Sequence, residues 1–359
     1  MGNKRIVIMA GGTGGHVFPA LAVAELLIEK GWQVSWLGTQ KGLESRVIPE
    51  NGIEIDWLSV TGVRGKGLTA KITALFMLFK ACVQAMKILR QRKPDVVLGM
   101  GGFVAGPGGL MAKLLGLPLI IHEQNRIPGT TNRLLARMAN QVLEAFPGSF
   151  SGKVKAKCTG NPLRKRFLTV SKNGRQRSEK EVRILIFGGS QGAQILNETV
   201  PEAIAEFQNS GLAMQSVQIK HQTGAAMFSQ VESRYKALGI TAETKAFIED
   251  MVAAYQWADL VICRAGAMTV SEVAAMGAPA IFIPLPGAID DHQTANARYL
   301  TDAGAGLLLM QNDLNPVTLA EHITKALEKL AVMSVAAQHC ARLDATALVA
   351  GYCIAEAGI

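Results

Sequence analysis

Residues 6–16 read Ile-Val-Ile-Met-Ala-Gly-Gly-Thr-Gly-Gly-His, and this stretch decides the fold. Its apolar part, Ile6–Ala10, predicts a buried strand, and the apolar pattern after the glycines predicts a helix that ends near Lys30. Glycines at such a turn let the backbone approach a ligand, and the N–H groups at the start of the helix can bind an oxyanion or a phosphate. The stretch therefore predicts a parallel α/β unit with a ligand-binding loop at Gly11–His16.

The same order of strand, glycine loop and helix returns 177 residues later, at Gly188 against Gly11. Val182–Phe187 predicts the strand, Gly188–Ala193 the loop and Ile195–Phe207 the helix. Further apolar strands alternate with loops and helices in both halves, as is typical of buried parallel sheets. We therefore predict an α/β fold with two Rossmann-like parallel-sheet domains that face each other across a cleft. The further strands are predicted at Val34–Leu37, Val96–Leu98, Leu119–Ile121, Ser216–Lys220, Leu260–Cys263 and Ala280–Pro284.

A chain of 359 residues suits two domains of ordinary size. We place the N-terminal domain at 1–165 and the C-terminal domain at 166–340, with the polar segment Val170–Glu181 as the linker. The stretch Val335–Glu356 predicts a helix, and we expect its last part, at about 340–359, to return and pack on the N-terminal domain.

The charge is unevenly distributed between the two halves. Residues 1–180 hold 27 Lys and Arg against 10 Asp and Glu, a net charge of +17, whereas residues 181–359 carry −8. A basic half can indicate a nucleic acid partner, but no recognition motif or pattern of stacking aromatics accompanies it. An anionic membrane surface explains the excess equally well, at ~1 kcal/mol for each basic residue near the surface.

The segment Leu68–Gln91 is the candidate for membrane contact. At helical spacing it shows one apolar stripe that is typical of a helix packed on a core. Met77, Leu78 and Ile88 lie outside that stripe, and basic residues at Lys71 and Lys80 flank them, which favours a helix at a membrane interface. The stripe expected in the core consists of Ile72, Leu75, Phe76, Phe79, Val83, Met86 and Leu89.

Several classes of protein are disfavoured. The N-terminus lacks the apolar core of a signal peptide, and the uncharged stretch 96–112 is too short to span a bilayer, so we expect a soluble or peripheral protein. Five scattered cysteines fit reduced thiols. A dinucleotide site is disfavoured because Val17 stands where a third glycine belongs. No D-x-D triplet is present, so we expect no metal and no cofactor.

In the N-terminal half, polar residues follow the predicted strands. His16 opens the helix after the first glycine loop and is a candidate general base or acceptor ligand. The run His-Glu-Gln-Asn at 122–125 follows the strand Leu119–Ile121, where open α/β sheets bind ligands. Glu123 from this run is a second candidate catalytic group, and Asn125 a candidate ligand.

The C-terminal half offers a site for a diphosphate and a sugar. Ser190 lies in the second glycine loop and can donate a hydrogen bond to a diphosphate. Glu272 lies one turn inside the helix that follows Gly266, where a carboxylate either complements the helix dipole or binds a ribose diol. Gln293 can bind a sugar hydroxyl through its amide.

These motifs together resemble the MurG family, the bacterial UDP-N-acetylglucosamine transferases of peptidoglycan synthesis. The resemblance runs along almost the whole chain, and seven ordered blocks are far more specific than a single glycine loop. The blocks are GGTGGH at 11–16, GMGGFVAGPGG at 99–109, HEQN at 122–125, GNPLR at 160–164, GGSQGA at 188–193, RAGAMTVSE at 264–272 and DHQTANA at 291–297.

The resemblance implies the GT-B architecture and the transfer of N-acetylglucosamine to the 4-hydroxyl of the muramoyl sugar of lipid I, with inversion, giving lipid II. It implies UDP-N-acetylglucosamine and lipid I as partners, no nucleic acid, and a peripheral location on the cytoplasmic face of the cell membrane. It places Glu272 at the ribose, the Ile248 backbone at the uracil and His16 near the acceptor hydroxyl. The implied donor contacts are Thr13, Gly14, Gly15, Asn125, Arg164, Ser190, Ile248, Ala267, Met268, Thr269, Val270, Ser271, Glu272 and Gln293.

Other functions use the same fold. A UDP-N-acetylglucosamine 2-epimerase would need no acceptor and no membrane, which the basic half and the apolar helix disfavour. A transferase to another lipid, such as a diacylglycerol, is a second alternative, and a non-catalytic nucleotide-sugar-binding module a third. The segment Pro284–Asp290 lacks a basic residue that some members of the family are expected to carry, so the details around Gln293 stay open.

Overall fold

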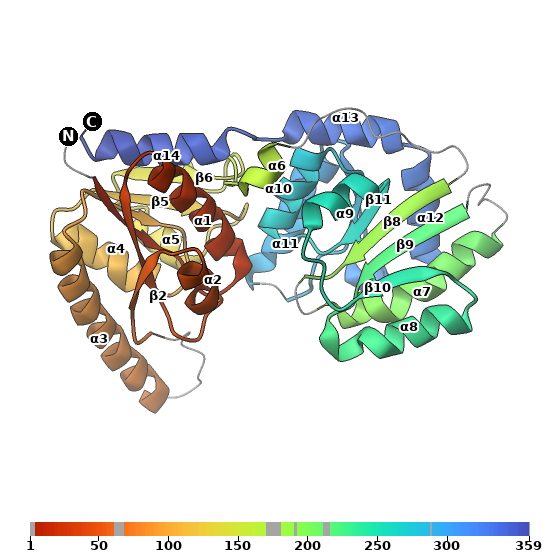
Figure 1. Cartoon of the computed structure of the whole chain (residues 1–359), viewed down its shortest axis with the longest axis horizontal. Coiled ribbons are helices and arrows are strands. Elements are labelled where there is room, and N and C mark those ends of the chain that lie inside the picture. Colours follow the sequence, from red (N-terminus) through yellow and green to blue (C-terminus); the bar gives the residue numbers. More distant parts are fainter. Residues whose placement is uncertain are drawn as a thin grey trace. The chain divides into compact units, whose positions relative to one another are not determined.

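The computed structural model describes residues 4–60, 68–169, 181–189, 192–210, 216–287 and 289–358. The chain divides into two compact units. Unit 1 is Met1–Lys165 with Arg342–Ile359, and unit 2 is Arg166–Ala341. Each unit contains one parallel sheet with helices packed against it (Figure 1), so the α/β fold class predicted from the sequence is confirmed.

The sheet of unit 1 has seven parallel strands in the order β3-β2-β1-β4-β5-β6-β7. Because the strands are parallel, their carboxyl ends meet at one edge, and the loops that follow them are neighbours there. The strands are β1 (Arg5–Met9), β2 (Gln33–Gly38), β3 (Glu54–Trp57), β4 (Val96–Gly99), β5 (Leu119–Glu123), β6 (Gln141–Glu144) and β7 (Lys157–Cys158). The helices of unit 1 are α1 (Gly14–Glu29), α2 (Glu44–Glu50), α3 (Leu68–Arg92), α4 (Ala105–Leu114), α5 (Thr130–Leu135) and α14 (Ala345–Glu356). The short helix α6 (Lys165–Leu168) begins at Lys165 of unit 1 and continues into unit 2.

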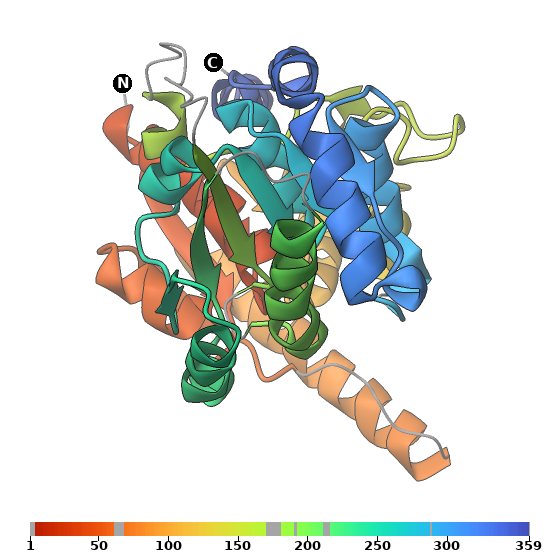
Figure 2. The same cartoon turned by 90° about the vertical axis from the view of Figure 1, so that its right-hand side faces the viewer.

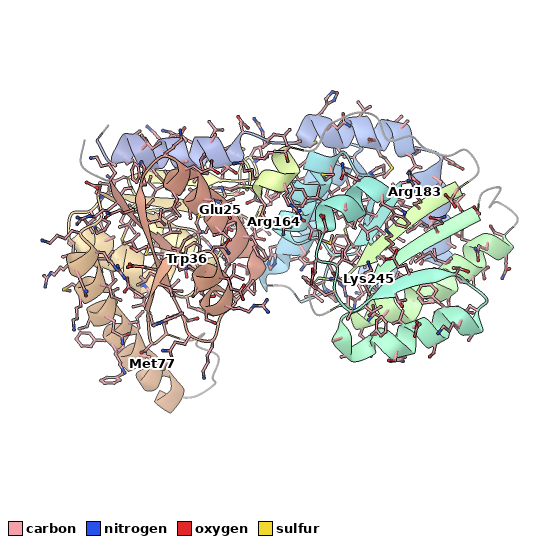
Figure 3. All side chains as sticks on the ribbon, viewed as in Figure 1. Glu25, Trp36, Met77, Arg164, Arg183 and Lys245 are labelled. Atoms are coloured by element: carbon pink, nitrogen blue, oxygen red, sulfur yellow. The ribbon has the colours of Figure 1, made fainter. Side chains whose placement is uncertain are left out.

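Alternating residues of β1 build the two cores of unit 1. Ile6 and Ile8 face a cluster that includes residues of α1 and α14, whereas Val7 and Met9 face a cluster that includes residues of α3 and α4. Successive side chains of a strand point to opposite faces, so a run that is apolar throughout is buried on both sides. Trp36, labelled in Figure 3, is fully buried in β2, and its Nε1–H donates to the carbonyl of Ala10 over 2.8 Å. This bond ties β2 to the start of the first glycine loop.

Helix α3 packs on α4 but with a different face from the one predicted. Ala81, Ala85 and Leu89 are buried, whereas Leu75, Phe76, Phe79 and Val83 are exposed, so the predicted core stripe is wrong for those four residues. Cys82, Met86 and Ile88 are partly buried against the same core, so Ile88, predicted to lie outside the core stripe, packs on the core instead. The small side chains of Ala81 and Ala85 allow a close approach to α4. In Figures 1 and 2 the N-terminal part of α3 projects from the rest of unit 1. The side chains of residues 68–74, Lys71 and Ile72 included, lie outside the described part of the chain.

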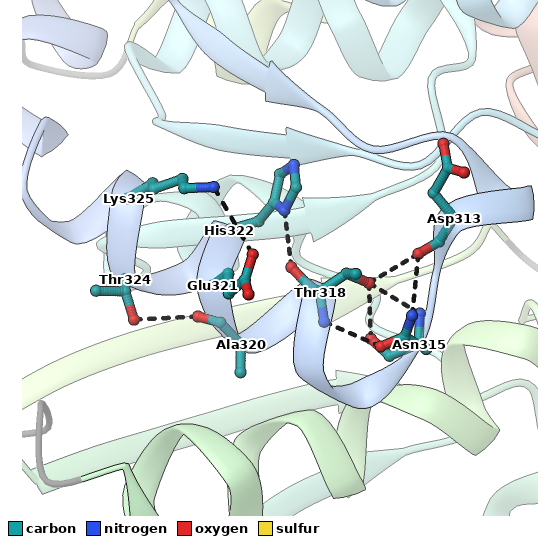
Figure 4. Close-up of polar contacts among 8 residues, drawn as sticks. All are labelled: Asp313, Asn315, Thr318, Ala320, Glu321, His322, Thr324 and Lys325. Atoms are coloured by element: carbon teal, nitrogen blue, oxygen red, sulfur yellow. Dashed lines mark hydrogen bonds and ion pairs between the residues drawn. The ribbon is translucent and has the colours of Figure 1, made fainter.

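Unit 2 has a parallel sheet in the order β10-β9-β8-β11-β12-β13. Helix α12 begins with a capping box in which Asn315 and Thr318 exchange side-chain-to-backbone hydrogen bonds (Figure 4), and Pro316 occupies the first helical position. The strands are β8 (Glu181–Phe187), β9 (Ser216–Gln222), β10 (Ala242–Lys245), β11 (Leu260–Cys263), β12 (Ala280–Phe282) and β13 (Gly306–Leu308). The α-helices are α7 (Gln194–Asn209), α8 (Phe228–Ala237), α9 (Met251–Trp257), α10 (Ala267–Met276), α11 (His292–Thr301), α12 (Pro316–Leu327) and α13 (Leu330–Cys340), with short 3₁₀ turns at Ala225–Met227, Ile289–Asp291 and Gln311–Asp313.

The helix predicted over Val335–Glu356 is in fact two helices. Helix α13 ends at Cys340 in unit 2, and α14 begins at Ala345 in unit 1. Helix α14 packs against α1, and its end is held by a hydrogen bond from Lys4 Nζ to the carbonyl of Ala357 over 2.8 Å. Most of the predicted linker, residues 170–180, lies outside the described residues.

Candidate active site

A buried carboxylate holds the first glycine loop. Glu44 is fully buried, and its Oε2 accepts the N–H of Gly12 over 2.9 Å. Its Oε1 accepts both the N–H and the hydroxyl of Thr39, over 2.9 and 2.7 Å. A Cβ on Gly11 would lie 2.6 Å from the same carboxylate, so the loop can approach Glu44 this closely only with glycine there. Sequence reasoning missed Glu44, which looked like an ordinary acidic residue at a helix start.

The first turn of α1 presents the residues Thr13, Gly14, Gly15 and His16. Thr13 is the N-cap residue but makes no side-chain capping bond, and the first turn contains no acidic residue. The first N–H groups of any helix lack partners within the helix, and here glycines leave them accessible. The turn can therefore donate hydrogen bonds to oxygen atoms of a ligand, as the sequence predicts.

His16 lies at one end of a row of polar side chains. Its Nδ1 is 2.8 Å from Gln124 Oε1. Gln124 Nε2 lies 3.0 Å from His122 Nδ1, and His122 Nε2 lies 2.9 Å from the carbonyl oxygen of Gly160. Gln124 and His122 are buried, whereas His16 is half-buried. Burial lowers the pKa of His122 to about 4, so this imidazole is neutral at pH 7.

The second catalytic candidate, Glu123, is surrounded by hydrogen-bond donors. Strand β5 runs on through His122 and Glu123, so these residues are buried rather than in an open loop. The Glu123 carboxylate accepts from the N–H of Asn125 over 2.9 Å, the N–H of Gly129 over 3.0 Å and the amide of Asn132 over 2.9 Å. These donors occupy both oxygen atoms of the carboxylate. The contacts therefore argue against catalysis by Glu123 and favour a role in shaping the loop that carries Asn125.

Arg164 lies in the segment after β7, with its guanidinium 5.3 Å from the centre of the Phe18 ring. The pKa of Glu25 on α1 is raised by burial and by the charge of Glu29. The positive charges of Lys165 and Arg164 act in the opposite direction and lower it. Figure 3 labels both Glu25 and Arg164. Arg164 therefore lies against α1, in the same unit as His16.

In unit 2, the second glycine loop borders a pocket of about 650 Å³. Gly192 has a φ of +76°, and a Cβ there would lie 2.0 Å from the carbonyl of Thr223, so this position requires glycine. Ser190 lies outside the described residues. The pocket is lined by Gly188, Gly189, Gly192, Ala193, Gln194, Ile195, Glu198, Arg264, Gly266, Thr269, Leu285, Gln293 and Gln311.

One buried amide connects this loop to Ile248. Gln222 Nε2 donates to the carbonyl of Gly189 over 2.8 Å, and Gln222 Oε1 accepts the N–H of Ile248 over 2.7 Å. The N–H of Ile248 is therefore already used within the protein, and its carbonyl is the group left for a base. Sequence reasoning missed Gln222, which ends strand β9 and resembles any polar residue at a strand end.

Helix α10 presents Ala267 to Glu272 in its first two turns, with Gly266 as its N-cap. Val270 is buried, so a ligand could contact this residue only through its backbone. Glu272 is half-buried, and the Tyr255 hydroxyl donates to its Oε2 over 3.3 Å. Its charge adds to burial in raising the pKa of the Cys263 thiol, which places the carboxylate near the end of β11. Thr269 of the same helix lines the pocket.

Gln293 and Arg264 complete the pocket. Gln293 Oε1 accepts the N–H groups of Ala265 and Leu285, over 3.3 and 3.0 Å, so its NH₂ group is the part left to donate to a ligand. Arg264 donates to the carbonyl of Pro284 over 3.0 Å and to Gln311 Oε1 over 2.7 Å. Burial lowers the pKa of Arg264 without discharging it. Arg264 thus supplies a positive charge beside the segment Pro284–Asp290, which itself has none.

The described residues contain neither a cluster suited to a metal ion nor a helix suited to span a membrane. No group of three or more His, Cys, Asp or Glu side chains among them is arranged to hold a metal ion. None of the helices in this part of the chain is long and apolar enough to cross a membrane.

Comparison with known proteins identifies the class. Residues 6–144 match the N-terminal domain of glycosyltransferase family 28, and residues 183–346 match the C-terminal domain of that family. The glycosyltransferase SnogD from Streptomyces nogalater has the same fold, with a TM-score of 0.66 at 18% identity over 99% of this chain and 100% of that one. Two parallel-sheet units with a loop-lined pocket therefore define a family 28 glycosyltransferase of GT-B type.

The particular family follows from closer relatives. A protein of Methylococcus capsulatus named UDP-N-acetylglucosamine–N-acetylmuramyl-(pentapeptide) pyrophosphoryl-undecaprenol N-acetylglucosamine transferase is 59% identical over 99% of both chains. A protein of Shewanella sp. (strain MR-4) with the same name is 48% identical over 99% of this chain and 98% of its own. The crystal structure of Acinetobacter baumannii MurG aligns with a TM-score of 0.82 at 41% identity, over 98% of this chain and 99% of that one. This chain belongs to the MurG family, and the resemblance seen in the motifs is confirmed.

Proposed function

We propose that this chain transfers N-acetylglucosamine from UDP-N-acetylglucosamine to the 4-hydroxyl of the muramoyl sugar of lipid I, giving lipid II and UDP. The observation that carries the proposal is the 59% identity, over essentially the whole chain, to a transferase named for this reaction. Two glycine loops, each at the start of a helix, supply backbone N–H groups that can bind oxygen atoms of the substrates.

The donor binds in the pocket of unit 2. The start of α7 and the charge of Arg264 lie on this pocket and favour the diphosphate and the negative charge that develops as UDP leaves. Glu272 accepts hydrogen bonds from the ribose hydroxyls, and the carbonyl of Ile248 accepts from the uracil. The Gln293 NH₂ donates to a hydroxyl of the transferred sugar. Ser190 is proposed for the diphosphate from the sequence alone.

The acceptor reacts at the first glycine loop. The Nε2 of His16 takes the proton of the muramoyl 4-hydroxyl as its oxygen attacks the anomeric carbon of the donor. The new C–O bond forms as the bond from the anomeric carbon to the β-phosphate oxygen breaks, and UDP keeps that electron pair. Attack from the face opposite the leaving group inverts the anomeric carbon.

Helix α3 is the proposed contact with an anionic membrane. Leu75, Phe76 and Phe79 are 68%, 69% and 66% exposed. The exposed, positively charged side chains of Lys80 and Lys87 lie on the same helix. Monomeric soluble proteins rarely expose several large apolar side chains together, and lysines beside them favour an anionic lipid surface. A polyprenyl acceptor stays in the bilayer, so an enzyme that uses it needs such a surface.

The function is tested by following radiolabel from UDP-N-acetylglucosamine to a lipid I analogue, with and without a chelator. We expect labelled lipid II in both cases, because helix N-termini and Arg264 supply the positive charge at the pocket. A new sugar formed from the donor alone would indicate an epimerase. Transfer to diacylglycerol but not to the lipid I analogue would indicate a different lipid glycosyltransferase.

The membrane contact is tested by combining Phe76→Ser, Phe79→Ser and Lys80→Glu. Loss of two exposed phenylalanines that are proposed to enter the lipid should weaken binding to vesicles of anionic lipid by about 10-fold or more. Transfer to lipid I in vesicles should fall, while transfer to a water-soluble, short-chain acceptor persists. Val332→Ser with Val335→Ser, two exposed apolar residues of α13, is the matched control. Equal losses on both acceptors would place the membrane face elsewhere.

A further inference from the structure

The row from His16 to Gly160 crosses three elements of unit 1. His16 is in the first turn of α1, Gln124 and His122 lie at the end of β5, and Gly160 follows β7. Five atoms of this row could each be donor or acceptor: Nδ1 of His16, the two ring nitrogens of His122, and the oxygen and nitrogen of the Gln124 amide. Two backbone carbonyls in contact with this row remove the ambiguity.

The first carbonyl fixes the amide of Gln124. One end of this amide lies 3.1 Å from the carbonyl oxygen of His122, which can only accept a hydrogen bond. That end must therefore be the NH₂ group, because an oxygen there would face another oxygen. The other end, Oε1, then faces His16 Nδ1 over 2.8 Å and can only accept. His16 must carry a proton on Nδ1 to make this bond.

The second carbonyl fixes the ring of His122. The Nε2 of His122 lies 2.9 Å from the carbonyl of Gly160, so Nε2 carries the proton. Because the buried ring is neutral, its Nδ1 holds a lone pair and accepts from Gln124 Nε2 over 3.0 Å. Both carbonyls thus require the same orientation of the amide. Gly160 has a φ of +83°, and a Cβ there would lie 2.4 Å from Cβ of Arg342, which precedes α14, and 3.3 Å from Cβ of Ala345, the first residue of α14. The start of α14 and the segment before it therefore close over this end of the row.

We infer that Gln124 is a positioning residue that holds His16 in the tautomer with the proton on Nδ1 and the lone pair on Nε2. Free histidine in water prefers the opposite tautomer, so the protein must supply this one. The catalytic consequence rests on the proposed function, in which His16 Nε2 takes the acceptor proton. Gly101 supports the same placement, because a Cβ there would lie 2.8 Å from His16 Nδ1 and push the ring away from Gln124.

The tautomer can be read directly from the free protein with ¹⁵N-labelled histidine. The nitrogen spectrum separates protonated from unprotonated ring nitrogens, and a His16→Asn variant identifies the signals of His16 among the six histidines. We expect Nδ1 protonated and Nε2 unprotonated in the unsubstituted protein at a pH where the ring is neutral. A protonated Nε2 with an unprotonated Nδ1 would overturn the inference without any further variant.

Gln124→Met tests the role of the amide. The methionine fills a similar volume but accepts no strong hydrogen bond, so we expect His16 to shift toward the Nε2-protonated tautomer. Turnover should fall by roughly 10- to 100-fold with the donor KM unchanged, since an orienting group supports but does not replace the base. Gln124→Glu retains an oxygen toward His16 and should restore the Nδ1-protonated tautomer and part of the turnover.

Asn132→Ala is the matched control. Asn132 is also buried and also donates to the His122 carbonyl, over 3.1 Å, but it bonds Glu123 instead of His16. We expect this variant to keep the His16 tautomer. If Gln124→Met leaves the tautomer unchanged, or Asn132→Ala changes it equally, Gln124 is not the positioning residue. If His16→Ala keeps full turnover, the proposed base fails while the tautomer result stands, so the two failures are distinguishable.

Discussion

The two glycine loops share a backbone arrangement and differ in the buried side chain that holds them. The second glycine of each loop has a positive φ, +96° at Gly12 and +104° at Gly189. Gly12 gives its N–H to the carboxylate of Glu44, whereas Gly189 receives a hydrogen bond from the neutral amide of Gln222. Two loops with the same local sequence pattern are therefore held by different groups, a carboxylate in unit 1 and a neutral amide in unit 2.

This difference supports the roles proposed for the two loops. A buried carboxylate opposes a diphosphate nearby, and Glu44 lies directly against the first loop. The second loop has a neutral amide behind it and the guanidinium of Arg264 on the same pocket. The second loop is thus the better diphosphate site, and the first loop, which carries His16, is the better place for proton transfer.

The largest expected effect is at the first loop. His16→Ala removes the proposed base, so turnover should fall by about 100-fold or more, with little change in the donor KM. Steady-state kinetics with lipid I analogue and donor measure both quantities. His339→Ala, an exposed histidine of α13, controls for the substitution itself. Intact turnover with a raised donor KM would make His16 a ligand of the donor.

Each unit also contains one buried neutral histidine, His122 in unit 1 and His221 in unit 2. Burial lowers the pKa of His122 to about 4 and that of His221 to about 3. The unfolded chain binds a proton near pH 6.5 and the folded chain only well below it. Each buried histidine therefore makes its full contribution to the free energy of unfolding above pH 6.5. This contribution is lost as pH falls toward 4, at up to about 1.4 kcal/mol per pH unit for each histidine.

Chemical denaturation of the His221→Gln variant and the unsubstituted protein at pH 7, 5.5 and 4.5 measures this effect. We expect the free energy of unfolding of the variant to fall less steeply over this interval. Glutamine does not titrate, and it retains an amide that can reach Tyr235, whose hydroxyl lies 3.0 Å from His221 Nδ1. Parallel curves would show that His221 is protonated as readily in the folded chain as in the unfolded one.

The next effect concerns the ribose end of the donor. Glu272→Ala should raise the donor KM by roughly 10- to 100-fold, because hydrogen bonds to a charged group contribute about 1.5–3 kcal/mol. Turnover at saturating donor should change less. Glu206→Ala removes an exposed carboxylate of α7 and provides the control. An unchanged donor KM would remove Glu272 from the donor site.

Local sequence patterns were sufficient for the repeated order of strand, glycine loop and helix. Strands β1 and β8 contain continuous buried apolar runs, Ile6–Met9 and Ile184–Phe187, which are easily recognised. The strands β3, β6, β7, β10 and β13 were not predicted, because they are short and lie at or near sheet edges. Glu44 and Gln222 were missed for another reason. Their partners in the glycine loops, Gly12 and Gly189, lie 32 and 33 residues away, and only the folded chain brings them together.

Helix α3 shows a limit of periodicity. The helix has large apolar residues on one side and small ones on the other, and the pattern alone favoured the large ones as the core. In the folded chain Ala81 and Ala85 face the core, because small residues permit a close approach to α4, and Phe76 and Phe79 remain outside. Hydrophobic periodicity alone could not determine which side of α3 packs on the core, because that depends on how closely the helix approaches α4.

The smallest expected effect tests the comparison between the loops directly. Gln222→Glu gives the second loop a carboxylate like the one behind the first. One carboxylate oxygen keeps the bond from the Ile248 N–H, whereas the other faces the carbonyl oxygen of Gly189, to which the amide nitrogen had donated. Its negative charge would also oppose a diphosphate at the adjoining pocket, so the donor KM should rise by about 10-fold, which corresponds to about 1.4 kcal/mol.

Gln218→Glu, the same change at an exposed position of β9, is the control. The acceptor KM should stay constant, because the acceptor reacts at the other loop. If the donor KM is unchanged in a folded Gln222→Glu protein, the charge behind a glycine loop does not determine which loop takes the diphosphate, and the difference between Glu44 and Gln222 is one of folding alone.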